Sequence, residues 1–358
     1  MSAIGFLVLL VIAIVVLMLL MTKAKLNPVM SLFVVALAFG VILGVFGTEG
    51  YSFMDTLNMI TTGFGSTLGS LGMPIILGAV LAMGVQDTGA AKSIANFFIK
   101  LFKGKNLELA PSLTAYVVSI PVFGDITTIV CSNIANVLGK RKHISMSTMA
   151  SFTQTGLNLT HAMVPPTPGI LAVSVALSAD LGLVISWGIV VTIITFFATW
   201  LILKRWAAKE WIPAVPEVTA EIEETNSDNV DDLLIKDKDL PGTFASFLTI
   251  LIPVILIAGG SFVGMLIPES TPDDALVRTL VAIASDKVVA LAMGVIYTMF
   301  LALGHKASVR KSNLDATGKD PECFREVVLN SWIARGMEVA LIALLVTAMG
   351  GGFSQVIK

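Results

Sequence analysis

Three prolines and a glycine interrupt a strongly apolar stretch of the sequence, THAMVPPTPGIL, at Pro165, Pro166, Pro168 and Gly169. Proline removes a backbone hydrogen-bond donor and clashes with the preceding helical turn. Inside a lipid bilayer, unwound backbone survives only where protein or a water-filled cavity surrounds it. The pattern therefore predicts a broken membrane helix whose free backbone groups serve a ligand, and a simple proline kink is the structural alternative.

A second apolar stretch is interrupted at SIPVFGDITT, residues 119–128, by Pro121 and Gly124. The residues after this break are polar: Asp125, Thr127 and Thr128. A carboxylate at membrane depth is a functional candidate by default, although a hydrogen-bonded structural acid is the alternative. Half-helix amino ends attract anions and half-helix carboxyl ends attract cations. If the two breaks face each other at the bilayer midplane, they form a polar site of the kind found in secondary transporters.

The site residues follow from this interpretation. We expect the substrate to be bound by these residues: Gly124, Thr127, Thr128, Thr160, Pro166, Thr167 and Gly169. Asp125 or His161 would carry a coupling proton, because a histidine titrates near neutral pH. A hydrogen bond from His161 to a neighbouring helix is the alternative. No metal site or cofactor is expected, since the two cysteines, Cys131 and Cys323, lie far apart and the chain has 3 histidines.

Composition places these breaks in a membrane protein. Of the 358 residues, 55% are hydrophobic and 13% are charged, whereas soluble domains carry roughly 25% charged residues. The apolar runs are long and continuous rather than alternating, which indicates helices and not strands. The sequence therefore predicts an all-α integral membrane protein, and nothing in it suggests a nucleic-acid partner.

The apolar runs define the expected transmembrane organisation. Spans are expected at about 3–22, 28–47, 55–86, 146–179 (the broken helix), 183–203, 243–267, 286–303 and 332–352. The acidic, proline-containing segment between them is too hydrophilic to pack a core and is expected to be a solvated cytoplasmic linker. Three parts result: a first transmembrane repeat at 1–206, the linker at 207–241 and a partial second repeat at 242–358.

Basic residues predict the orientation of the spans. They cluster at Lys23–Lys25, Lys92–Lys105, Lys140–Lys142, Lys204–Lys209 and Lys306–Lys311. The positive-inside rule places these clusters in the cytoplasm and the N-terminus outside. Residues 107–139 have basic clusters on both flanks, so both ends should lie inside. Each arm is long enough for about half a bilayer at ~1.5 Å per residue, which predicts a re-entrant hairpin.

The order of the spans also indicates an inverted repeat. The first three expected spans run opposite to the last three, as two opposed repeats require. PIILGAVLAMGVQDTG in the first half resembles LLVTAMGGGFSQVIK at the end. A second hairpin, a second broken helix and a last span have no counterpart before Lys358. We therefore expect the second repeat to be incomplete, as in a C-terminally truncated copy or a partial gene.

At these motifs the chain resembles a known family. THAMVPPTPGILAVSVALSADLG resembles the signature of the gluconate:proton symporter (gluconate permease) family. SIPVFGD is similar to its first hairpin tip, and GFGSTLGSLGMPIILGAVLAMGVQDTGAA to its third span. The resemblance runs from about residue 25 to the end. It implies a proton-coupled carrier of small sugar acids or related carboxylates, with a hairpin and a broken helix in each half.

The hypothesis is therefore a secondary active transporter in the bacterial cytoplasmic membrane. It would carry gluconate or a related hydroxy-carboxylate in symport with a proton, and sodium coupling is left open. Thr167 and Ile170 stand where the sugar-acid carriers usually have His and Pro, which leaves gluconate itself open. A homodimer is expected only by analogy. A non-functional fragment, a channel or, least favoured, a membrane enzyme are the alternatives, although no nucleophile motif is present.

Overall fold

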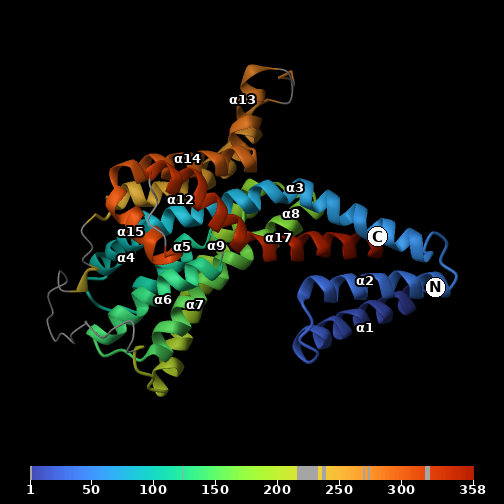
Figure 1. Ribbon diagram of the computed structural model, residues 1–358, viewed down its shortest axis with the longest axis horizontal. Helices are drawn as coiled ribbons and strands as arrows, with labels where there is room; N and C mark the ends of the chain where they lie inside the picture. The colour runs from blue at the N-terminus through green and yellow to red at the C-terminus, as the bar shows by residue number, and fades with distance from the viewer. Residues whose placement is uncertain are drawn as a thin grey trace. The chain divides into compact units, whose positions relative to one another are not determined.

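The regular structure is helical throughout the described residues of the computed structural model, which are 2–122, 124–215, 233–235, 239–268, 271–272, 275–318 and 323–358 (Figure 1). Among them, seven helices are long and apolar enough to cross a membrane. The prediction of an all-α integral membrane protein is confirmed. The chain divides into two compact units, Met1–Ile75 with Val339–Lys358, and Ile76–Glu338.

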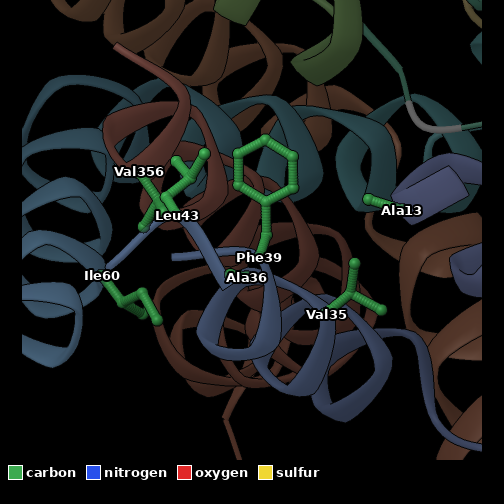
Figure 2. Close-up of a cluster of buried hydrophobic side chains, with 7 residues drawn as sticks. All are labelled: Ala13, Val35, Ala36, Phe39, Leu43, Ile60 and Val356. Atoms are coloured by element: carbon green, nitrogen blue, oxygen red, sulfur yellow. The ribbon is translucent and has the colours of Figure 1, made fainter. Parts of the chain in front are cut away.

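The first unit joins both ends of the chain. Its helices are α1 (Ala3–Thr22), α2 (Pro28–Val45), the first part of α3 (Phe53–Asp87) and the last part of α17 (Trp332–Ile357). Figure 2 shows its core, made of Ala13, Val35, Ala36, Phe39, Leu43, Ile60 and Val356. A Cβ added at Gly63 would lie 2.5 Å from the carbonyl oxygen of Gly351. Glycine therefore lets α3 and α17 approach closely here.

The second unit contains both predicted breaks. Its first helices after α3 are α4 (Ala90–Leu101), α5 (Leu109–Val118), α6 (Gly124–Arg141), α7 (Met146–Met163), α8 (Pro168–Ala176) and α9 (Leu181–Trp206), followed by the short η1 (Ala207–Lys209). Helix α7 packs against α5, α6 and α9. A Cβ at Gly156 would lie 2.0 Å from the carbonyl oxygen of Ser112, so α5 and α7 are in backbone contact.

The remaining helices of this unit follow residue 242 along the chain. They are α12 (Thr243–Leu266), α13 (Leu276–Ser285), α14 (Lys287–Gly304), α15 (Lys306–Thr317), α16 (Phe324–Glu326), the π-helical turn η2 (Val327–Ser331) and the start of α17. Helix α12 packs against α14, α13, α9 and α4. A Cβ at Gly294 would lie 2.6 Å from the Pro253 ring, so α12 and α14 also meet at a glycine. Helix α13 has no buried residue and projects beyond α12 and α14 (Figure 1).

Part of the predicted linker is packed and not solvated. Residues 216–232 and 236–238 lie outside the described residues. Between them, Leu233 is 1% exposed, and the Asn96 side chain bonds both backbone groups of Ile235, at 3.0 and 2.8 Å. Composition did not predict this contact, because one apolar cluster in an acidic segment leaves its average polarity almost unchanged.

Candidate functional site

Both expected interruptions of regular helix are present. Helix α5 ends at Val118 and α6 begins at Gly124. Helix α7 ends at Met163 and α8 begins at Pro168, with Thr167 as the residue before its first turn. Proline explains the second break directly, because Pro168 supplies no amide for a continuous helix and suits the first position of a new one.

The two breaks meet in one hydrophobic cluster. Ile120, from the break between α5 and α6, is 6% exposed, and Val164, from the break after α7, is fully buried. Their cluster is completed by Ile185 of α9, Val254 and Ile257 of α12, and Ala290 of α14. Helix α3 also reaches the hairpin, since a Cβ at Gly78 would lie 3.1 Å from the carbonyl oxygen of Pro121.

The first turn of α6 lies beside the last turn of α7. A Cβ at Gly124 would lie 3.8 Å from both Cδ2 and Nε2 of the His161 ring, and 3.4 Å from Leu157. The imidazole of His161 therefore lies in van der Waals range of the amino end of α6. Asp125 belongs to the same helical turn, and its side chain lies outside the described part of the structure.

Two threonines follow on α6. Thr127 is fully buried, and its hydroxyl has no hydrogen-bond partner among the described residues. A buried polar group without a partner costs free energy, so an orphaned hydroxyl is a candidate for binding a ligand or water. Thr128 is half-buried.

The two threonines of the broken helix have protein partners. The Thr160 hydroxyl donates to the carbonyl oxygen of Tyr116 at 2.9 Å and is hydrogen-bonded to the Ser119 hydroxyl. Thr160 therefore fastens α7 to α5, and a substrate contact would have to replace one of these bonds. The Thr167 hydroxyl donates to the carbonyl oxygen of His161 at 2.7 Å, which satisfies a carbonyl that the proline break leaves free.

The two remaining expected residues, Pro166 and Gly169, lie near the start of α8 and differ in burial. Pro166 is buried, whereas Gly169 is exposed, and no atom lies within 4 Å of a Cβ built on it. Thr167 makes no side-chain hydrogen bond to the first amides of α8. Helices α6 and α8 thus both begin at the breaks, and the amino end of a helix carries partial positive charge that favours an anion.

Asp87, which sequence reasoning missed, is the centre of a buried polar cluster. It accepts hydrogen bonds from Trp332 Nε1 at 2.8 Å and from Ser312 Oγ at 2.8 Å. Arg335 completes the cluster through Nη1 at 2.7 Å. An acidic residue at the end of a long apolar span is a functional candidate, and this signal could have drawn attention to Asp87. Its partners could not be predicted, because they are more than 200 residues away in the sequence. Among the residues that the structure describes, no group of three His, Cys, Asp or Glu could hold a metal ion.

Comparison with known proteins identifies the family. The family model described as GntP family permease matches residues 6–358. The chain belongs to this family. The resemblance seen at the two breaks is confirmed by this match, and no solved structure matches the chain.

Several curated relatives of this permease are bacterial. An uncharacterized permease of Haemophilus influenzae is 29% identical over 98% of the chain and 67% of the relative. A gluconate permease of Zymomonas mobilis is 28% identical, over 96% of the chain and 69% of the relative. A high-affinity gluconate transporter of Escherichia coli is 24% identical, over 98% and 72%. The chain is therefore a multi-pass membrane transporter and not an enzyme.

Proposed function

We propose that the protein is a secondary active transporter that carries gluconate or a related small hydroxy-carboxylate in symport with a proton. The observation that carries this proposal is the meeting of the two helix breaks, with Ile120 and Val164 in one buried cluster and Gly124 beside His161. Broken helices that meet within the membrane are the usual binding sites of secondary transporters. The names of the gluconate-transporting relatives support the choice of substrate class.

The substrate carboxylate would bind at the amino ends of α6 and α8. Both ends carry unsatisfied amides, and neither needs a buried lysine or arginine to favour an anion. The Thr127 hydroxyl, buried and without a partner among the described residues, would donate to a carboxylate or hydroxyl of the substrate. Thr167 would hold the break open by bonding the carbonyl oxygen of His161.

The coupling proton would be carried by His161 or Asp125. The His161 ring lies 3.8 Å from the position of a Cβ on Gly124, at the amino end of α6. A positive charge is disfavoured at that end of a helix unless an anion is bound there. A carboxylate bound at that end and a proton carried by His161 would offset each other's charge, and such linkage between two ligands is what symport requires.

We also propose the inverted-repeat fold and an N-terminus outside the cell. Helix α3 has 35 residues, and the continuous helical stretch Phe324–Ile357 has 34. These two long helices would be the third spans of the two repeats. The chain aligns with 67% of the Haemophilus relative and 69% of the Zymomonas relative, so the activity of a whole permease is itself part of the proposal.

Uptake of labelled gluconate into proteoliposomes tests the proposal. An imposed inward pH gradient should drive accumulation, and a sodium gradient alone should not. Thr127→Val should lower uptake strongly, because it keeps the volume and removes the donor. Thr56→Val is the matched control, since the Thr56 hydroxyl is also buried without a partner in the described part of the chain, but Thr56 belongs to the first unit. Equal uptake by the two variants would refute the role of Thr127, and undiminished coupling in both Asp125→Asn and His161→Asn would refute the coupling assignment.

A further inference from the structure

A cavity of about 610 Å³ lies beside α6 in the second unit. Its walls come from α6, from the junction of α3 and α4, and from α15. Small-molecule sites typically enclose about 300–1,000 Å³, so a sugar acid fits within it. The expected binding residues do not line this cavity, which begins further along α6.

Helix α6 connects the cavity with the hairpin break. Val130 and Ile134 line the cavity, and they follow Thr127 by three and seven residues. Residues at these spacings share one face of a helix. The face of α6 that carries the orphaned Thr127 hydroxyl therefore continues, one turn later, as the wall of the cavity.

The cavity lining carries two lysines and two acids. Lys92 and Lys311 line it, and both belong to the basic clusters that predict the cytoplasmic side. Asp87 also lines it, but its carboxylate is paired with Arg335 at 2.7 Å and does not act as a free negative charge. Asp315 is an exposed acid on the α15 wall. Asn133, exposed on α6, adds a neutral hydrogen-bonding group to the lining.

We propose that this cavity is the passage through which the carboxylate moves between the site at the hairpin break and the cytoplasm. This inference rests on the proposed function and adds the route: along the Val130–Ile134 face of α6, past Asn133, and out between α4 and α15. The cavity would then open on the side of the membrane where the basic loops lie.

Thiol labelling without substrate tests the route separately from transport. The background is the full chain with Cys323→Ser, in which Cys131 remains buried. Asn133→Cys introduces a thiol on the cavity wall, and Ser132→Cys is the matched control, one position away on α6 and absent from the wall. Each variant is treated with a charged, membrane-impermeant thiosulfonate in inside-out and right-side-out membrane vesicles.

Asn133→Cys should react about tenfold faster than Ser132→Cys, and only in inside-out vesicles, because the ionised thiol forms where water has access. Equal rates for the two variants, or faster reaction in right-side-out vesicles, would overturn the passage. Failure of the proposed function looks different: labelling would follow the expected pattern while labelled gluconate is not accumulated. Val137→Cys, further along the same wall, provides a second lining position if Asn133→Cys fails to fold.

Discussion

Arg335 Nη1 donates a hydrogen bond to Asp87 Oδ2 over 2.7 Å, which joins the first turn of α17 to the last residue of α3. The Asp87 side chain is fully buried and that of Arg335 is 14% exposed. Trp332 and Ser312 donate to the same carboxylate. A buried ion pair of this kind needs additional hydrogen bonds to offset desolvation of its charges, and Asp87 has them.

Asp87→Asn should destabilise the protein by about 3–5 kcal/mol, because it leaves the Arg335 charge buried without its counter-ion. Thermal unfolding in detergent measures the loss. Glu108→Gln is the control, since Glu108 pairs with Lys204 at 3.8 Å and Lys204 is 49% exposed. A partly exposed pair contributes about 0–1 kcal/mol. Similar losses for both variants would contradict the special role of Asp87.

Gly156→Ala should destabilise the contact between α5 and α7. The added methyl group would meet the Ser112 carbonyl oxygen at 2.0 Å, and relieving such overpacking costs about 1–3 kcal/mol. Gly259→Ala on α12 is the control, because no atom lies within 4 Å of its Cβ position. That control should be neutral or more stable by about 1 kcal/mol, given the helix propensity of alanine. An unchanged midpoint of thermal unfolding for Gly156→Ala would be inconsistent with the close approach.

Thr167→Val should weaken the break between α7 and α8. The variant loses the hydroxyl that donates to the carbonyl oxygen of His161 at 2.7 Å, and one such bond contributes about 1 kcal/mol of stability. Thr167→Ser keeps the donor and should restore both stability and gluconate uptake. If serine behaves as valine does, the hydroxyl alone does not account for the role of Thr167, and the assignment to the hydrogen bond with His161 would be refuted.

His161→Asn should abolish the effect of the pH gradient while exchange of labelled for unlabelled gluconate continues. Asparagine keeps a hydrogen-bonding group but cannot bind a proton near neutral pH, whereas imidazole can. Comparing gradient-driven uptake with exchange in the same proteoliposomes separates coupling from binding. Gradient-driven accumulation by His161→Asn at the level of the unmodified protein would move the coupling role to Asp125.

The breaks could be predicted from sequence because their cause is local. Pro165, Pro166 and Pro168 act on their own helical turn, whatever surrounds them. The partners of Thr160 could not be predicted, because Ser119 and Tyr116 reach it only when α5 packs against α7. The same holds for Asp87 and Arg335, which are 248 residues apart. Contacts between helices depend on the packing of the whole fold, and the local patterns of one sequence do not predict which distant residues will meet.

The fastening of α5 to α7 restricts how this permease can move. Ser112 donates to the carbonyl oxygen of Phe152 at 2.5 Å, Thr160 bonds Tyr116, and Gly156 brings the two backbones into contact. Swinging the hairpin away from α7 would break all of these at once. If the proposed transport alternates between the two faces of the membrane, α5 and α7 would move together as one block, and the relative movement would occur where this block meets other helices.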